Sequence, residues 1–381
     1  MPEPRGSPRD LMSHFSAVTD PREGWRVLYP LREVLLLVLS ASLAGMEDFV
    51  EIKLWGEQRL AFLRRFYPYE RGVPSHDTLN DLINALDPQV FKACFLAWVE
   101  GLGDDQPDVI AIDGKTSRRS HDRAKERAPL HMVSAWACRQ RLVLGQEAVD
   151  VKSNEIIAIP LLLERLELTG ALVTLDAMGT QVKIAETIVR RGGDYLLALK
   201  ENRPVLYADI ETFFADPAAE GCESFETTDA DHGRIEHRRH VICHKVEWLF
   251  SDRRYAHEPR FPHLAMIGMA QSTTQRDGKV AHERRYYLCS KGLSAEAFAR
   301  AVRAHWGIEN RLHWVLDVIF HEDLARLRSG FGPENMAVVR HMAMNLLRTP
   351  KDRHSLKCRR KLACLNPAYL ETLISQSAAL T

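Results

Sequence analysis

Two aspartates stand at the ends of short apolar segments. Val109–Ile112 runs into Asp113, and Leu172–Leu175 runs into Asp176. A carboxylate at the carboxyl end of a buried strand projects where open α/β sheets bind their ligands. Either aspartate alone is better explained as a turn former. If the strands are neighbours, however, the two carboxylates converge and repel each other unless a cation lies between them, and such a set suits Mg²⁺ or Mn²⁺.

A third acid is expected on residues 294–317, a segment whose pattern predicts one helix. Glu309 lies there with Trp306 and His313 at i, i+3, i+7 spacing, so the three share one helical face. Buried glutamates are rare unless they are paired or bind a metal, so an acid between aromatic residues favours a ligand role. A solvated helical acid is the alternative. Three nearby acids are rivals for the same role: Asp317, Glu322 and Asp323.

The order of elements around these acids predicts an α/β fold. Strand-like segments at 109–113, 131–136 and 141–149 are followed by a helix at 155–168, a strand at 172–176, a helix at 181–191 and a strand at 195–199. Pro160 would kink the first of these helices or delay its start. Apolar strands that alternate with helices predict a mixed sheet with helices on both faces, in the order of the ribonuclease-H-like fold.

The rest of the chain divides around this core. A helix is predicted at 205–214, and strand-like alternation continues until the last helix, so we expect a β-rich insertion at 215–290 within a catalytic domain at 108–350. The residue pattern of 1–100 predicts an N-terminal helical domain, and residues 101–107 are expected to form a polar linker. Residues 351–381 predict a basic C-terminal tail or helix. Two helices that begin after Ser75 and Asp87 form either a DNA-binding helix-turn-helix or an ordinary helical hairpin.

Composition excludes few classes of function. The 381 residues carry 51 Lys+Arg and 51 Asp+Glu, and this balance disfavours a general nucleic-acid coat protein. The seven cysteines show no zinc-site spacing. The apolar run Val34–Ala44 is too short to span a membrane and too deep in the chain for a signal peptide. We therefore predict a cytoplasmic protein without a membrane partner, associated with the nucleoid when it is bound to DNA.

Motifs along nearly the whole chain resemble those of bacterial insertion-sequence transposases of the DDE class, specifically the H-repeat-associated subfamily. The matching segments are Asp20–Arg22, Pro74–Thr78, Ile112–Thr116, Lys152–Ile156, Thr174–Gln181, Gly193–Lys200, His232–Arg238, His305–Asp317, Phe320–Asp323 and Arg326–Gly330. The resemblance implies a ribonuclease-H-like core with a β-rich insertion and a metal-binding catalytic triad of Asp113, Asp176 and Glu309. His305 and Leu316 depart from the wider class, which often has Arg and Lys at these places.

The resemblance also implies the reaction and its cofactors. Water would first cleave the phosphodiester at an element end, and the freed 3′-hydroxyl would then attack target DNA. Two Mg²⁺ ions, with Mn²⁺ as a substitute, would serve both steps. Asp113 would bridge the ions, and Asp176 and Glu309 would each hold one. The partners would be double-stranded DNA, at the terminal inverted repeats and at the target, and a second copy of the chain. The alternatives are a degenerate or domesticated relative that binds DNA without cutting it, and a nuclease that hydrolyses without joining.

DNA contacts are expected from local basic patches, which give salt dependence without sequence information. Any single patch is better explained as solvated surface. Recognition of the terminal repeats is assigned to the N-terminal helices with help from the insertion. The candidate DNA-binding residues are Lys115, Arg118, Arg119, Lys200, Asn202, Arg203, Arg234, Arg238, Arg239, Arg311, His313, Arg326 and Arg328, with the run Arg359–Lys361 as a further candidate.

Overall fold

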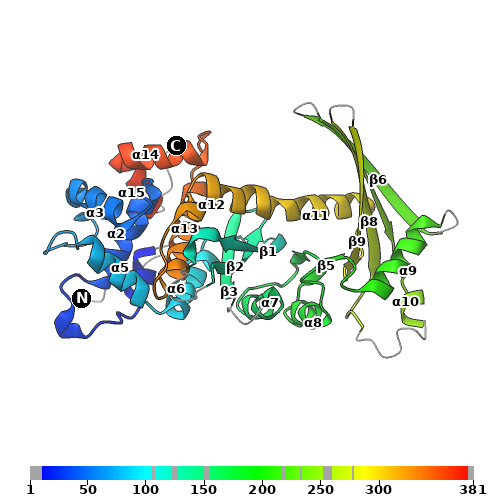
Figure 1. The fold of residues 1–381 in the computed structure, drawn as a ribbon, viewed down its shortest axis with the longest axis horizontal. Coiled ribbons are helices and arrows are strands. Elements are labelled where there is room, and N and C mark those ends of the chain that lie inside the picture. The colour runs from blue at the N-terminus through cyan, green and yellow to red at the C-terminus, as the bar shows by residue number, and fades with distance from the viewer. Residues whose placement is uncertain are drawn as a thin grey trace.

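The computed structural model describes residues 11–104, 106, 108–121, 128–149, 154–216, 220–231, 234–251, 260–276 and 279–375. A long sheet lies beside a body of helices that holds both ends of the chain (Figure 1). The N-terminal helices are α1 (Leu11–Ser16), α2 (Leu31–Leu43), α3 (Phe49–Gln58), α4 (Leu60–Leu63), α5 (His76–Ala85) and α6 (Pro88–Glu100). The C-terminal helices are α13 (Gly332–Arg348), α14 (Leu356–Leu365) and α15 (Pro367–Ser375).

The sheet contains nine strands in the order β3-β2-β1-β4-β5-β9-β8-β7-β6. Its strands are β1 (Val109–Ser117), β2 (Leu130–Ala137), β3 (Leu142–Val149), β4 (Leu172–Leu175), β5 (Asp194–Leu199), β6 (Cys222–Asp231), β7 (Arg234–Cys243), β8 (Met266–Arg276) and β9 (Lys279–Cys289). β1, β4 and β5 are parallel, and all other neighbours are antiparallel. The first five strands confirm the predicted ribonuclease-H-like order.

Helices cover both faces of the sheet, as predicted. α7 (Glu155–Leu163) and α8 (Val182–Arg190) lie on one face, and α11 (Ala295–Ile308) crosses the other (Figure 1). α9 (Pro204–Ala215) and the short α10 (Trp248–Ser251) lie beside the insertion. Pro160 does not delay α7, which begins at Glu155, but the helix ends at Leu163 instead of the predicted residue 168. A proline inside a helix removes one backbone hydrogen bond, which favours an early end.

The insertion is β-rich, as predicted, and it continues the main sheet. β6 to β9 form an antiparallel meander, and β9 pairs with β5 through Leu196↔Cys289 to Leu199↔Tyr286. β5, the last strand of the predicted core, is therefore an interior strand of the sheet and not an edge strand. The whole sheet is one hydrogen-bonded layer, and α11 returns from the insertion across its surface toward β1 and β4 (Figure 1).

One hydrophobic core joins the two ends of the chain. The buried side chains of α2, α5 and α6 belong to the same cluster as those of α13, α14 and α15. α2 is buried almost all round, and α13 packs against it. Of the predicted basic tail or helix, residues 351–375 form the helical alternative, and they fold onto the N-terminal helices, where Leu370, Leu373 and Ile374 are buried. None of the helices in the described ranges is long and apolar enough to cross a membrane.

The helices α5 and α6 favour the helical-hairpin interpretation over a helix-turn-helix. Ser75 caps α5 and Asp87 caps α6, as the sequence predicted. α6 then packs against α1, α13 and β3, which leaves only Gln89, Ala93, Ala97 and Glu100 exposed on it. A helix that reads a DNA groove needs exposed polar or basic side chains, and this face carries no cation.

Candidate active site

Strand alternation places both aspartates on the face that α11 covers. Ile110 and Ile112 of β1 enter the core beneath α7 and α8, so Asp113 points to the opposite face. Asp176 follows β4 directly. Two residues earlier, Thr174 Oγ1 forms a hydrogen bond of 2.9 Å with Nδ1 of His305 in α11. The pairing of β1 with β4 ends at Ile112↔Leu175. The two carboxylates therefore follow the last paired residues of neighbouring parallel strands.

The predicted end of β1 is wrong in one respect. The strand does not stop at Asp113 but continues to Ser117, because β2 pairs with it along its whole length, as far as Ser117↔Leu130. Asp113 consequently has a regular strand backbone on both sides. A side chain in this position is held by the sheet and not by a loop, which limits its movement.

Glu309 begins a π-helical turn, Glu309–His313, between α11 and α12 (Trp314–Val318). The single helix predicted for this segment is thus interrupted at the predicted acid. Such π-turns occur often at functional sites. The packing argument for Glu309 was wrong, because Glu309 and Trp306 are both exposed and do not lie on a buried face. Its candidacy depends on its position beside the two aspartates.

Electrostatics links the three acids. Burial, with smaller contributions from the negative charges of Asp176, Glu155 and Glu309, raises the pKa of Asp113 to about 7, against a hydrogen bond from the Gly114 N–H. Like charges close to one another oppose ionisation in this way. Within the described ranges, however, no three Asp, Glu, His or Cys side chains converge closely enough to share one ion.

Glu155 is a site residue that the pattern did not single out. It lies in the first turn of α7, and its Oε1 is 2.6 Å from His131 Nε2, whose Nδ1 is 2.7 Å from Thr116 Oγ1. This chain of contacts fixes the Glu155 carboxylate beside Asp113. Glu155 does belong to Lys152–Ile156, one of the segments that carry the family resemblance. Lys152 and Ser153 of that segment lie outside the described residues. An acid at a helix start is otherwise explained by the helix dipole.

Gly114 is the residue that allows Glu155 to approach β1. A β-carbon at Gly114 would lie 2.2 Å from Glu155 Oε1 and 2.6 Å from His131 Nε2. We therefore expect Gly114→Ala to displace the Glu155 carboxylate and, in the metal-dependent DNA cleavage that the family resemblance implies, to lower the rate by roughly 10–100-fold, the usual effect of losing a supporting contact of a metal site. The measurement is the cleavage rate beside that of Gly103→Ala, where the new β-carbon meets Gln140 Oε1 at 3.4 Å and the Glu100 carbonyl at 4.0 Å, both ordinary contacts. Equal rates for the two variants would contradict this role.

Two histidines, His305 of α11 and His313 of the π-turn, lie near the aspartates. His313 Nδ1 is 3.5 Å from Asp113 Oδ2. Burial, with a smaller contribution from the Lys115 charge, lowers the pKa of His313 to about 4. Burial likewise lowers the pKa of His305 to about 4. Both rings are neutral near pH 7, so neither supplies the positive charge of a phosphate contact at that pH. This placement favours a positioning role for His313 over the DNA contact predicted.

Lys115 is enclosed by carboxylates. Its Nζ lies 2.7 Å from Asp317, 3.2 Å from Glu322 and 3.4 Å from Asp323, and its side chain is only 10% exposed. Glu322 is also 3.4 Å from Arg340. These are the three rival acids for the third catalytic position, and all contact this one ammonium group. The arrangement favours a structural role for Lys115 over the predicted phosphate contact.

The other predicted DNA contacts are dispersed. Arg118 and Arg119 are exposed near Asp323, and the Arg119 carbonyl accepts a hydrogen bond from Arg328. The Asn202 side chain donates to the Ala177 carbonyl at 2.6 Å, and Lys200 beside it is exposed. In the insertion, Arg238 contacts Asp229 and Glu236, and Arg239 lies 3.5 Å from Glu226. Arg203 contacts Gln181, and Arg359 pairs with Asp352. Arg311 is exposed, and the Arg234 side chain lies outside the described residues.

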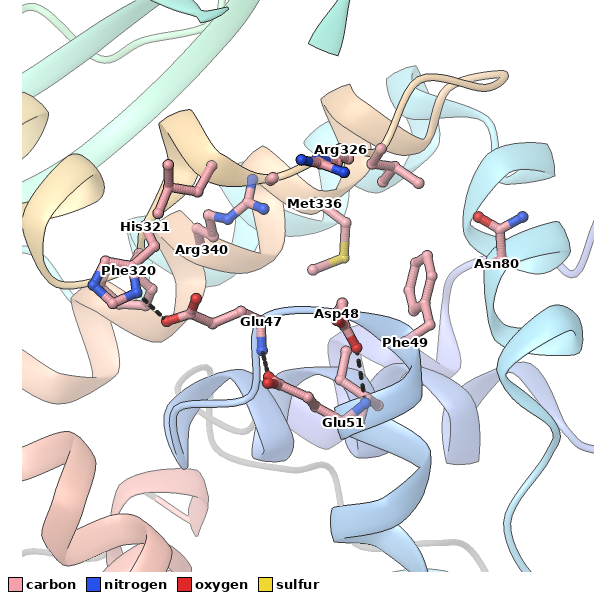
Figure 2. A pocket seen from close by; sticks show the side chains of 14 residues that line it. Glu47, Asp48, Phe49, Glu51, Asn80, Phe320, His321, Arg326, Met336 and Arg340 are labelled. Atoms are coloured by element: carbon pink, nitrogen blue, oxygen red, sulfur yellow. Dashed lines mark hydrogen bonds and ion pairs between the residues drawn. The ribbon is translucent and has the colours of Figure 1, made fainter. Parts of the chain in front are cut away.

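Arg326 lines a cavity of about 380 Å³ between the N-terminal helices and the segment after α12. Figure 2 shows Arg326 across this cavity from Glu47, Asp48 and Glu51, with Glu47 in contact with His321. Three carboxylates in one wall repel phosphate, so this placement disfavours a DNA contact inside the cavity.

A larger groove of about 1480 Å³ follows α11 and the inner face of the insertion. Glu309 and Arg311 line its end at the catalytic helix, whereas Asp113 and Asp176 do not line it. Strands β6 to β9 supply its other wall, including Arg238 and Arg285. The groove thus leads from the insertion to the third acid.

Comparisons with known proteins identify the family of this chain. Residues 104–346 match the family described as a transposase DDE domain, and residues 12–99 match the associated N-terminal family. Two relatives are the "H repeat-associated putative transposase YhhI" of Escherichia coli K12, 36% identical over 97% of this chain and 98% of its own, and the "putative transposase YncI" of Escherichia coli O157:H7, 36% identical over 98% and 96%. A solved piggyBac transposase synaptic complex with hairpin DNA shows a distant likeness, at 10% identity, over 97% of this chain and 80% of its own, with a TM-score of 0.42. The chain belongs to the transposase DDE-domain family.

Proposed function

We propose that this transposase cleaves DNA at the ends of an insertion sequence and joins the freed ends to target DNA, with Asp113, Asp176 and Glu309 as its catalytic acids. The observation that carries the proposal is the placement of Asp113 and Asp176 on one face of neighbouring parallel strands, beneath the helix that bears Glu309. The raised pKa of Asp113 supports it, because a buried cluster of carboxylates is costly unless cations compensate it.

The donor chemistry fits divalent metal ions. Carboxylate oxygens are preferred ligands of Mg²⁺ and Mn²⁺, and Mg²⁺ is usually held by one or two carboxylates together with water and substrate phosphates. Such a set does not require three side chains on one ion, which agrees with the spacing of the acids in the described ranges. Asp113 would contact both of two ions, and Asp176 and Glu309 would contact one each. When bound, the ions supply an activated nucleophile and stabilise the leaving oxygen.

The residues of the chain itself position the acids and set the charge around Asp113. The sheet holds Asp113 and Asp176, and the π-turn sets the direction of Glu309. His131 and Thr116 hold Glu155, whose negative charge keeps the neighbourhood of Asp113 attractive to cations. The neutral His313 ring fills the space next to Asp113 without a positive charge that would compete with a cation. The groove beside Glu309 offers a path for double-stranded DNA, and two copies of the chain would be needed to pair two element ends.

The test is cleavage and joining of labelled DNA that carries the element's own ends, with Mg²⁺, Mn²⁺ or EDTA. We expect metal-dependent cleavage and joined product in the wild type and neither in Asp176→Ala nor in Glu309→Ala. Glu296→Ala, on the exposed start of the same helix, is the matched control. Cleavage that survives Glu309→Ala would remove this residue from the triad. Cleavage without joining would indicate a nuclease, and DNA binding without cleavage would indicate a degenerate relative.

A further inference from the structure

Three arginines from separate elements lie near one another around the π-turn. Arg141 lies in the turn between β2 and β3, Arg311 in the π-turn, and Arg348 at the end of α13. Buried Asn345 joins two of these elements, because its side chain bonds both the N–H and the carbonyl of Val143 at 2.9 Å. Arg141 and Arg348 are each within three residues of that junction.

Arg348 is the centre of the group. Its Nη2 donates to the Arg311 carbonyl at 2.5 Å, and its guanidinium lies 4.6 Å from the centre of the Trp136 ring. Its Nε is buried and has no hydrogen-bond partner within the described residues. Burial lowers the pKa of Arg348, and with a smaller contribution from the positive charges of Arg141, Arg311 and Arg359 it falls to about 9. A partly buried cation whose charged neighbours are all cations lacks the partner that normally offsets desolvation.

The backbone of Arg141 adds a second observation. Its φ is +59°, in the left-handed region that non-glycine residues rarely adopt, and its N–H donates to the Ala137 carbonyl at 2.7 Å. A glycine or asparagine would adopt this turn at lower cost. The exposed arginine side chain is thus carried at a strained position, which is a feature of binding sites. No ion pair joins Arg141 or Arg311 to a carboxylate in the described part of the chain.

We propose that Arg141, Arg311 and Arg348 form a phosphate-binding site for the DNA backbone. Guanidinium groups bind phosphate oxygens in pairs, and a phosphodiester would supply the missing negative charge. Arg311 lies two residues after Glu309 and lines the groove that also reaches Glu309. A DNA strand held here would therefore pass Glu309. This inference rests on the proposed function for the identity of its ligand but not for the presence of an anion site.

The test uses the full chain, EDTA to prevent cleavage, and a labelled duplex of arbitrary sequence over a range of NaCl concentrations. We expect Arg141→Gln and Arg311→Gln each to lower the slope of log K against log salt by about 0.9, which is roughly eightfold weaker binding at 0.1 M salt. Arg190→Gln, on α8 at the opposite face of the sheet, removes an exposed arginine that pairs with Glu164 and is expected to leave the slope unchanged. Arg141 is exposed, so its substitution spares the core.

Thermal unfolding with inorganic phosphate separates the site from its ligand. Phosphate is expected to raise the unfolding temperature of the wild type and of Arg190→Gln more than that of Arg141→Gln. Wild-type DNA binding with unchanged slopes in both cluster variants would overturn the inference and leave the proposed function intact. Phosphate protection lost in Arg141→Gln, together with no DNA binding by the wild type, would overturn the DNA assignment along with the proposed function. Equal phosphate protection in all variants would overturn the site itself.

Discussion

Asp113→Asn is expected to stabilise the metal-free protein while it abolishes cleavage. Burial and three nearby carboxylates raise the pKa of Asp113 from 3.8 to about 7 in the folded chain. The folded state therefore holds this proton more tightly than the unfolded state does. The stabilising contribution is complete below about pH 4 and is lost as the pH rises through about 7. Asparagine is uncharged and escapes that loss.

The size of the effect depends on pH. Each pKa unit corresponds to about 1.4 kcal/mol, and partial exposure of the carboxylate reduces the total, so we expect Asp113→Asn to be roughly 2–4 kcal/mol more stable at pH 8 and nearly equal at pH 4. Cleavage is expected to fall roughly a thousandfold, since metal-assisted stabilisation of several kcal/mol is lost. Urea unfolding in EDTA at both pH values and cleavage with Mg²⁺ measure these changes.

The control for this variant is Asp81→Asn, on the exposed side of α5. It removes a carboxylate of the same type without a buried acidic neighbour, so neither stability nor cleavage should change. A variant Asp113→Asn that is less stable than the wild type at pH 8 in EDTA would show that the carboxylates do not strain the metal-free fold. Full cleavage by the same variant would exclude Asp113 from the catalytic acids.

Lys92→Met is expected to destabilise the protein by about 3–5 kcal/mol, the usual cost of removing one partner of a buried ion pair. Lys92 Nζ lies 2.6 Å from Glu147 of β3 and 2.9 Å from Glu334 of α13, and its side chain is 1% exposed. Without the ammonium group, two carboxylates would remain at the junction of three elements, although Arg165 stays 3.0 Å from Glu147. Denaturant unfolding of the full chain gives the free energy.

The matched control is Lys53→Met. Lys53 and Glu57 form an ion pair with the same 2.6 Å separation, but the two side chains are 34% and 44% exposed. Exposed pairs contribute about 0–1 kcal/mol, so this variant should lose little stability. Similar losses in both variants would indicate that burial does not determine the contribution of Lys92. Partial recovery in Lys92→Met/Glu147→Gln is expected, because the second change removes one unpaired charge.

The sequence predicted the strands well wherever burial shapes the residue pattern. The runs before Asp113 and Asp176 are apolar because helices cover both faces of the sheet, so their positions and order were predictable. The extension of β1 to Ser117 was not, because polar residues there are held by pairing with β2 and not by their own pattern. The core shared by α2 and α13 depends on contacts between the two ends of the chain, which local periodicity does not reveal.

The site was only partly predictable for the same reason. Strand position singled out the two aspartates, whereas Glu309 came chiefly from the family resemblance, and its expected burial was wrong. A π-turn adds one residue to a helical turn, too small a change for periodicity to detect. Lys115 was assigned to DNA because the acids that enclose it lie about 200 residues later in the chain. Arg141 and Arg348 belong to no motif, and only the fold brings them together.

Because the strands of the insertion belong to the same sheet as β1, β4 and β5, the insertion cannot be removed or exchanged between proteins without affecting the rest of the sheet. β5 is bordered by β4 on one side and by β9, from the insertion, on the other. Removal of the insertion would leave the backbone groups of β5 unpaired along an apolar strand, which is a template for aggregation. It would also remove the segment from which α11 returns with Glu309. The β-rich segment is therefore a structural partner of the catalytic half and not a detachable module.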